Sequence, residues 1–525
     1  MTKLSEVFPR CRVLLGVKSW QRVLGVVGDG LEPTEFPVVL GKLGEPGVPP
    51  FFTGLARIEL ACFQVSSADP IPDSTDKPML NPTLQILPVT WTNLVNLLTS
   101  SKGRDLARVK PGNEYILVWR EPETGRVRVK VAGSCDLLAI KIVVEELDPD
   151  DVARESSVPT GKIDAIIREA VWNGLVLSPL STLCRETSAS VKGGDVNHSV
   201  ADVFTLQWHL TQECDLHCRH CYDRTNRTSF PFERALKLLD ELGAFCRSRF
   251  VRGQVSLTGG NPLLYPHFFE LYQAAADREL MIAILGNAVE RSDLERIVAI
   301  RMPVYYQVSL EGLESHNDRI RGEGNYRRTV GFLRMLTEMG VPNIVMLTLT
   351  RHNLDQVIPL ADELEGITGG MAFNRLALFG EGAALELPTP IEYRLFLEEY
   401  VRSLESHPVL GLKDNLLNTV MEGSGKELFG GCAGYGCGAA FNFVSILSDG
   451  EVHACRKFPS PIGNIITESL EKVYLSEAAC RYRSGCSACA GCSLNAVCRG
   501  CPAITASLGL DPFSERDPYC FRNPS

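Results

Sequence analysis

The sequence predicts an α/β protein, with a partial (β/α)6 barrel of the TIM type between an N-terminal winged-helix-like α+β module and a cysteine-rich C-terminal domain. Over residues 205–406, short β-branched runs alternate with amphipathic stretches of helical length. This alternation indicates parallel strands joined by crossover helices, and about six such units make a partial barrel. Upstream, two alternating runs resemble a hairpin, and near the end ten cysteines crowd into residues 432–520.

Composition and charge limit the class of protein. The 525 residues exceed one ordinary domain, and 45% hydrophobic with 22% charged residues is typical of a soluble globular protein. The net charge of -10 argues against nucleic acid as a partner, because phosphate contacts need clustered Lys and Arg. We find no secretory signal and no run of about 18 apolar residues. We therefore expect a cytoplasmic protein with no membrane partner.

The N-terminal part is expected to contain a helical region and a small module. Residues 1–105 carry helical apolar spacing with Pro-rich breaks, and we assign them no chemical role. In residues 106–186 a hairpin is followed by helical runs and the closing strand Gly-Leu-Val-Leu, an order that indicates a winged helix. Acidic residues in this module would repel DNA phosphates. Residues 187–202 are rich in Ser, Thr, Gly and Asn and are predicted to be a linker.

The predicted barrel covers residues 203–406. Reactive groups of such barrels lie at the carboxyl ends of the strands. Cys214, Gly259 and Ser309 each come just after a predicted strand, so we expect them to converge on one mouth. The predicted strands cover residues 204–209, 255–257, 281–286, 304–309, 344–350 and 371–379.

Three cysteines, Cys214, Cys218 and Cys221, follow the first predicted strand in the stretch Cys-Asp-Leu-His-Cys-Arg-His-Cys-Tyr. Three thiolates around a four-iron cluster leave one iron without a protein ligand, where a small molecule can coordinate. Structural zinc is the alternative, but zinc sites usually close with four ligands in two pairs. The three cysteines with unequal gaps favour an iron–sulfur cluster.

This Cys-x3-Cys-x2-Cys spacing resembles the signature of the radical SAM superfamily. The resemblance implies a [4Fe-4S] cluster whose open iron binds S-adenosyl-L-methionine, which is then cleaved reductively. Gly259-Gly260-Asn261-Pro262 resembles the segment that meets the methionine amine, with Asn261 where the family commonly has Glu. Close backbone approach explains the glycines.

Further matches imply the rest of the nucleotide site. Ser309-Leu-Glu311-Gly and the Asp-Arg-Ile-Arg-Gly run ending in Arg321 and Gly322 resemble family segments at the fourth strand. By this analogy Ser309 and Arg321 hold the methionine carboxylate, and Glu311 replaces the usual Asp. Asn287 and the segment 374–380 match positions that often line the nucleoside.

The C-terminal domain, residues 407–525, resembles the SPASM extension of peptide-modifying radical SAM enzymes, which holds two auxiliary [4Fe-4S] clusters. Two zinc knuckles are the alternative. Cys480 and Cys486 belong to neither of the two four-cysteine ligand sets given next, and a ligand swap that involves Cys486 is an alternative. The family pattern implies Cys432, Cys437, Cys455 and Cys501 as ligands of the first auxiliary cluster, and Cys489, Cys492, Cys498 and Cys520 as ligands of the second.

The whole pattern resembles radical SAM maturases of ribosomal peptides, with some similarity to the subgroup paired with cysteine- or selenocysteine-bearing peptides. The module at 106–186 is similar to their peptide-recognition domain, which binds a leader peptide as an added edge strand. We expect an oxidoreductase that abstracts a hydrogen atom from a precursor peptide and takes electrons from a flavodoxin or ferredoxin. The product, whether thioether, crosslink, epimer or oxidised backbone, stays open, and no acid, base or radical-relay residue is assigned. The alternatives are a sulfatase-maturase-like enzyme and a zinc-stabilised winged-helix regulator.

Overall fold

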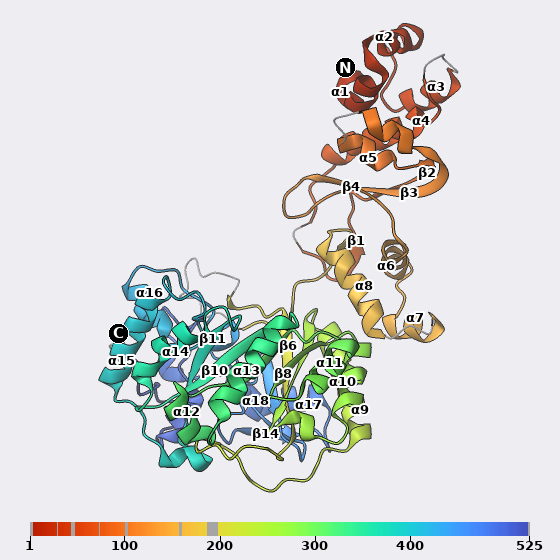
Figure 1. Cartoon of the computed structure of the whole chain (residues 1–525). Helices are drawn as coiled ribbons and strands as arrows, with labels where there is room; N and C mark the ends of the chain where they lie inside the picture. The colour runs from red at the N-terminus through yellow and green to blue at the C-terminus, as the bar shows by residue number, and fades with distance from the viewer. Residues whose placement is uncertain are drawn as a thin grey trace. The chain divides into compact units, whose positions relative to one another are not determined.

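The computed structural model describes residues 4–28, 30–43, 48–72, 74–99, 103–156, 160–185 and 198–522. The chain forms two compact units, Met1–Leu180 and Ser181–Ser525 (Figure 1). Of the predicted linker 187–202, residues 187–197 lie outside the described residues. No helix in the described part of the chain is both long enough and apolar enough to cross a membrane.

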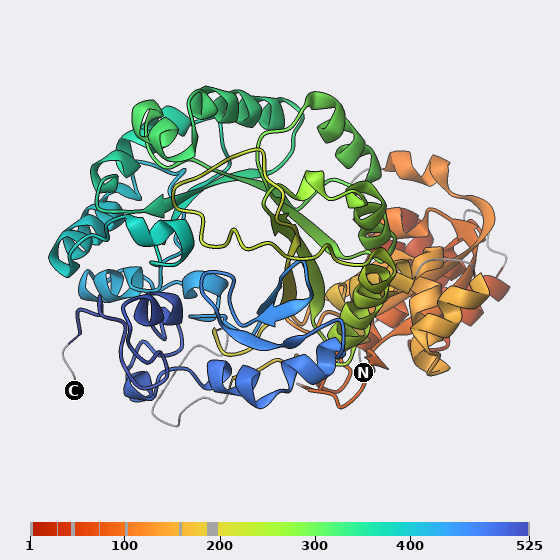
Figure 2. The same cartoon turned by 90° about the horizontal axis from the view of Figure 1, so that it is seen from below.

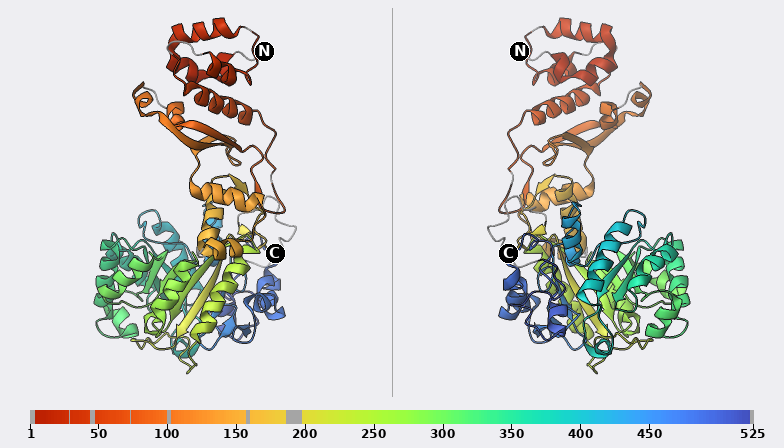
Figure 3. Two further views of the ribbon diagram at one scale, coloured as in Figure 1. Left: turned by 90° about the vertical axis from the view of Figure 1, so that its right-hand side faces the viewer. Right: turned by 90° about the vertical axis from the view of Figure 1, so that its left-hand side faces the viewer.

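The first unit is built around an antiparallel sheet of order β2-β3-β4. Side chains alternate along β3, so Ile116 and Val118 join one hydrophobic core while Leu117 and Trp119 join another. The first core belongs to α2–α5 and the second to α6, α8 and β5, on opposite faces of the sheet (Figure 3). The elements are α1 (Leu4–Val7), α2 (Pro9–Val27), α3 (Phe36–Lys42), α4 (Phe52–Ser66), β1 (Met79–Leu80), β2 (Gln85–Thr92), α5 (Leu94–Thr99), β3 (Lys110–Arg120), β4 (Val127–Val131), α6 (Ser134–Val144), α7 (Pro149–Ser156), α8 (Thr160–Trp172) and β5 (Val176–Leu177).

The expectation of a helical region over residues 1–105 is only partly right, because β1 and β2 are strands. Pro88 lies within β2 and obscures its pattern, since proline cannot donate a hydrogen bond to a sheet. The residue is tolerated because β2 is an edge strand. β2 pairs with β3, and β1 pairs with β5. Two strands that precede residue 106, β1 and β2, therefore pair with strands of the module predicted at 106–186.

The second unit contains a nine-stranded sheet in which six parallel strands, β6 to β11, lie in chain order. The predicted α/β alternation is confirmed, and each strand is followed by at least one helix. Figure 2 shows these helices, coloured yellow-green to teal, in an arc around the outer side of the sheet. The elements are β6 (Val203–Thr211), α9 (Phe232–Arg247), β7 (Arg252–Gly259), α10 (Phe268–Asp277), β8 (Met281–Leu285), α11 (Arg291–Ile300), β9 (Tyr305–Ser309), α12 (Glu314–Arg321), α13 (Asn325–Glu338), β10 (Asn343–Leu349), α14 (Val357–Leu364), β11 (Met371–Arg375) and α15 (Pro390–Ser403).

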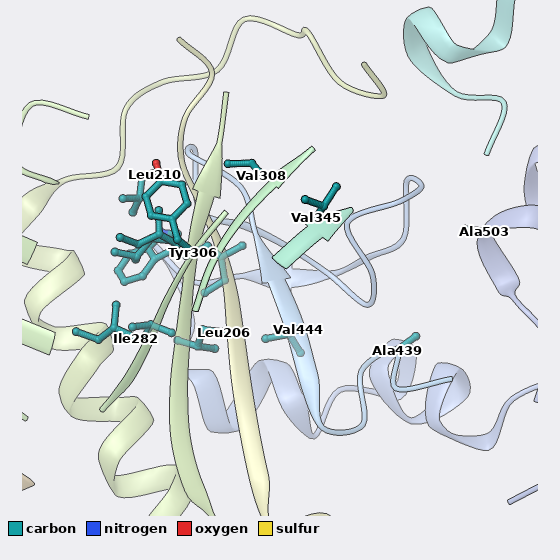
Figure 4. Packing of buried hydrophobic residues seen from close by; sticks show 14 of the residues in the cluster. Leu206, Leu210, Ile282, Tyr306, Val308, Val345, Ala439, Val444 and Ala503 are labelled. Carbon is teal, nitrogen blue, oxygen red and sulfur yellow. The ribbon is translucent and has the colours of Figure 1, made fainter. Parts of the chain in front are cut away.

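The cysteine-rich segment extends this sheet. β12 runs parallel to β6, and β13 and β14 follow as antiparallel strands. Val444 of β12 packs with Leu206 of β6 and Ile282 of β8 in one continuous core (Figure 4). The six parallel strands β6 to β11 and the cysteine-rich segment therefore contribute strands to the same sheet. The remaining elements are α16 (Leu417–Gly423), β12 (Phe443–Ile446), β13 (Glu451–His453), β14 (Pro461–Asn464), α17 (Leu470–Tyr474), α18 (Glu477–Ser484) and α19 (Pro502–Ser507).

Candidate cofactor and cluster sites

A cavity of about 260 Å³, named here the main cavity, lies at the carboxyl ends of the parallel strands. All six parallel strands β6 to β11 contribute to its wall. The wall includes the predicted residues Cys214, Cys218, Cys221, Gly259, Gly260, Asn287, Ser309 and Arg321.

The three cysteines reach this cavity from the loop after β6. The Asn287 side-chain amide lies 3.6 Å from the Cys214 sulfur, and the backbone N–H of Leu216 donates to the same sulfur at 3.4 Å. Burial raises the pKa of the Cys218 thiol, although Arg321 nearby acts in the opposite direction. The set therefore consists of three soft sulfur donors with hydrogen-bond donors aimed at one of them, which suits an iron–sulfur cluster.

Gly259 and Gly260 are required by the packing of β7 against the segment that leads to Cys214. Gly259 has φ +136°, and a Cβ there would lie 2.3 Å from the Thr211 carbonyl oxygen. A Cβ on Gly260 would lie 2.1 Å from the Glu213 carbonyl oxygen. Only glycine permits this approach. The glycines are therefore needed for the packing of the chain's own backbone, and both also line the cavity.

Asn261 and Pro262 do not line the cavity, although the sequence assigned them to cofactor binding. Asn261 is buried, its Oδ1 accepts from the Leu263 N–H, and its Nδ2 donates to Asp215. Pro262 begins the short 3₁₀ helix that Asn261 caps. Both residues therefore shape the turn behind the wall.

Glu311 also lies behind the wall and not on it. Its Oε1 accepts from Arg321 Nε at 2.9 Å and lies 2.9 Å from His220 Nε2. Its Oε2 accepts from the Thr348 N–H at 2.8 Å. Burial opposes ionisation, but His220 and Arg321 outweigh it and lower the pKa of Glu311 to about 2. Glu311 is therefore a buried anion that orients Arg321, whose side chain is only 9% exposed.

Arg375 lines the same cavity and is held by two carboxylates. Its Nε donates to Asp414 at 2.8 Å, and its two terminal nitrogens donate to Asp517 at 3.0 and 2.7 Å. In this group, named here the Arg375 triplet, Arg375 and Asp517 are buried and the Asp414 side chain is 9% exposed. Arg375 is therefore committed to internal ion pairs rather than to a nucleoside.

A smaller cavity of about 40 Å³, named here the first auxiliary cavity, is lined by Cys432, Cys437, Cys455 and Cys501. Burial, with Cys501 and Cys432 nearby, raises the pKa of the Cys437 thiol to about 12. These four thiols are the set that the sequence assigned to the first auxiliary cluster.

Another small cavity of about 20 Å³, named here the second auxiliary cavity, is lined by the second predicted set: Cys489, Cys492, Cys498 and Cys520. The Gly500 N–H donates to the Cys498 sulfur at 3.5 Å. Neither spare cysteine borders either small cavity in the described structure. The Cys486 thiol donates to the Glu515 carbonyl at 3.2 Å, while Cys480 is exposed beside Arg483.

Comparison with known families accounts for both parts of the second unit. Residues 208–364 match the radical SAM superfamily, and residues 437–502 match the SPASM iron–sulfur cluster-binding domain. The chain carries a radical SAM domain and a SPASM domain.

Several known proteins resemble this one. A Methanosarcina barkeri AdoMet-dependent heme synthase is 23% identical over 61% of this chain and 96% of its own length. The mycofactocin maturase MftC of Mycobacterium ulcerans is 27% identical over 62% of this chain and 89% of its own length. The crystal structure of Streptococcus suis SuiB bound to precursor peptide SuiA superposes with a TM-score of 0.51 at 18% identity, covering 78% of this chain and 96% of that one. At this low sequence identity, the likeness to SuiB concerns the fold alone.

Among the residues of the main cavity that were not singled out from the sequence are His209, Arg456 and Lys457. His209 is flanked by the buried residues Trp208 and Leu210, so nothing in its local pattern separates it from a core residue. Arg456 and Lys457 directly follow Cys455, and that adjacency is a signal that could have identified them.

Proposed function

We propose that this protein is a radical SAM oxidoreductase that modifies a ribosomally made peptide. One observation carries the proposal: the cysteines of the Cys-x3-Cys-x2-Cys motif border one cavity with Arg321 at the carboxyl ends of six parallel strands. A [4Fe-4S] cluster and S-adenosylmethionine held there by these residues would supply the radical chemistry for hydrogen-atom abstraction from the substrate.

The chain's own residues bind and orient these groups. Cys214, Cys218 and Cys221 would hold the cluster. Arg321, held by Glu311, would bind the methionine carboxylate through its remaining N–H groups. Ser309 and the backbone at Gly259 and Gly260 lie on the same wall and would complete the methionine site.

The eight SPASM cysteines would hold the two auxiliary clusters, four thiolates each. Because these cavities lie in the same unit, we infer that they exchange electrons with the reaction site. A flavodoxin or ferredoxin would reduce the enzyme. The chain's net charge of -10 and the compartment of such donors favour a cytoplasmic enzyme that acts on neither nucleic acid nor membranes.

A peptide is the favoured substrate for two reasons. MftC, a relative at 27% identity, is named as a maturase. The matches to the heme synthase and to MftC each leave more than a third of this chain without a counterpart, and the first compact unit, Met1–Leu180, offers a separate surface for a substrate. Its sheet has a short outer strand, β4, to which we propose that a leader peptide adds as a further strand. A cysteine- or selenocysteine-bearing precursor is the subgroup that the sequence favours.

The decisive experiment compares two cysteine variants after anaerobic reconstitution. The wild-type protein should bind about twelve irons, three clusters of four. Cys218→Ala should abolish deoxyadenosine formation. Cys480→Ala removes an exposed thiol outside all three cavities and should leave activity unchanged. Full cleavage by the Cys218 variant would refute the proposal.

The same assay separates the competing substrates. Cys498→Ala should retain part of the cofactor cleavage but stop the mass change of the peptide. Oxidation of a Cys or Ser in a folded protein would support a sulfatase-maturase-like enzyme instead. A reaction with a tetrapyrrole alone would favour the activity for which the heme synthase relative is named. A colourless protein that contains only zinc would support a regulator.

A further inference from the structure

His209 is a buried polar residue for which the fold supplies no partner at one ring nitrogen. It lies near the carboxyl end of β6, borders the main cavity and is only 4% exposed. Its Nε2 is buried and has no hydrogen-bond partner among the described residues. Leaving such a buried group unpaired is unfavourable, so its presence beside the cavity points to a ligand that completes the bond.

Arg456 lies next to His209 on the same wall. Its Nη1 donates to Thr258 Oγ1 at 3.3 Å, and within the described part of the chain it forms no ion pair. Burial and then the positive charge of Arg456 lower the pKa of His209 to about 3, so the imidazole is neutral at physiological pH. The wall thus offers a guanidinium that has no ion-pair partner among the described residues, and a neutral imidazole that donates a hydrogen bond when its proton is on Nε2.

The nearby carboxylate is not available to Arg456, because it is already paired. Asp223 accepts from Thr225 at 2.6 Å, from Gln212 at 3.2 Å and from Arg227 at 3.3 Å. Lys457, which follows Arg456, borders both the main cavity and the first auxiliary cavity. The wall around Arg456 therefore keeps a surplus of positive charge.

We propose that His209, Thr258 and Arg456 form a subsite for a carboxylate of the substrate. This inference rests on the proposed function and adds that the peptide presents an Asp, a Glu or its C-terminal carboxylate beside the reacting residue. A carboxylate matches the site because it accepts two or more hydrogen bonds and neutralises the guanidinium. A cationic side chain would be repelled by Arg456.

S-adenosylmethionine also has a carboxylate, but a different part of the cavity fits it. Ser309 lies at the carboxyl end of β9, and Arg321 lies at the end of α12, where Glu311 orients it. His209 lies on β6, which pairs with β12 of the SPASM segment on one side and with β7 on the other. We therefore assign the His209 wall to the substrate.

The test uses the reconstituted full-length protein with S-adenosylmethionine and two small probes. N-acetyl-glutamate methylamide and N-acetyl-glutamine methylamide differ only in one carboxylate. Saturation-transfer NMR titration should show the acid binding about tenfold or more tightly than the amide. Arg456→Gln should reduce the affinity for the acid to that for the amide, and His209→Leu should weaken it as well.

Arg394→Gln is the matched control, because it removes a charge from an exposed helix pair with Glu398 and should change nothing. The EPR change that S-adenosylmethionine causes in the reduced protein should be the same in wild type and Arg456→Gln. A loss of that change would assign Arg456 to the cofactor carboxylate and overturn the proposal, as would equal affinity for acid and amide. Neither probe needs to react, so failure of the subsite is distinguishable from failure of the enzymatic function.

Discussion

Glu311 is a single carboxylate on which three partners depend. It accepts hydrogen bonds from Arg321 and from the Thr348 N–H, and it contacts His220. Its side chain is 2% exposed. Removing its charge would leave the Arg321 guanidinium buried without a counter-ion, which is far more costly than losing a surface pair.

Glu311→Gln should therefore lower the free energy of unfolding by about 3–5 kcal/mol and weaken S-adenosylmethionine binding. Glu314→Gln, which affects a more exposed pair with Arg327, should cost no more than about 1 kcal/mol. Denaturant titration and cofactor-binding titration check both variants. Equal losses in the two variants would contradict the role given to Glu311. Because the folded pKa of about 2 lies below the ordinary 4.5, this stabilisation is present above pH 4.5 and lost as the pH falls towards 2.

The end of β7 and the loop that carries the cysteines depend on each other through two glycines. The Gly260 N–H donates to the Thr211 carbonyl, and the Asn261 N–H donates to the Glu213 carbonyl. These bonds fix the segment immediately before Cys214. A side chain at Gly260 would therefore displace the cysteine loop.

Gly260→Ala should reduce iron content and cofactor cleavage severely, because its Cβ would lie 2.1 Å from a backbone oxygen. Gly331→Ala is the matched control, since Gly331 lies within α13 and a Cβ there meets nothing within 4 Å. That control should gain about 0.5–1 kcal/mol of stability. Iron analysis and thermal unfolding of both variants provide the check, and a normal iron content in the first would be evidence against this coupling.

Local patterns predicted the parallel strands well. The run 281–286 corresponds to Met281–Leu285, and the run 304–309 corresponds to Tyr305–Ser309. Buried β-branched runs bounded by helical stretches fix such strands without long-range information. The pairing of β12 with β6 could not be predicted in this way, because it joins residues far apart in the chain.

The cysteine sets were predictable, whereas the supporting side chains were not. The resemblance to the SPASM extension implied which four thiols group with Cys437 and which four with Cys498, and each small cavity is lined by one of these groups. The burial of Glu311 and Asn261 behind the wall depends on tertiary packing. His209 gave no signal, since a histidine within an apolar strand looks like a core residue.

The Arg375 triplet connects distant parts of the second unit. Arg375 ends β11 and borders the main cavity, Asp414 borders the first auxiliary cavity, and Asp517 borders the second. Asp517 also accepts from the Cys501 N–H at 3.0 Å. One buried cation thus fixes segments that surround all three cavities.

Arg375→Met should leave two carboxylates buried together and destabilise the protein by about 3–5 kcal/mol, with loss of auxiliary iron. Adding Asp517→Asn should recover part of this loss, because one of the unpaired charges is removed. Thermal unfolding and iron content across the two single variants and the double variant measure the coupling. Additive losses would mean that the two residues act independently.

The two units have separate hydrophobic cores. The core of the radical SAM and SPASM domains draws only on residues from Leu183 onwards, and the cores of the first unit end at Val176. A protein that lacks residues 1–180 should therefore keep its three clusters and its uncoupled cleavage of S-adenosylmethionine. Its affinity for the precursor peptide should fall by at least about tenfold, because the edge strand proposed to bind the leader is gone. Iron analysis, deoxyadenosine assays and peptide-binding titrations of the truncated and full-length proteins distinguish the outcomes. Unchanged peptide affinity would remove the first unit from substrate recognition, whereas loss of the clusters would show that the second unit needs the first in order to fold.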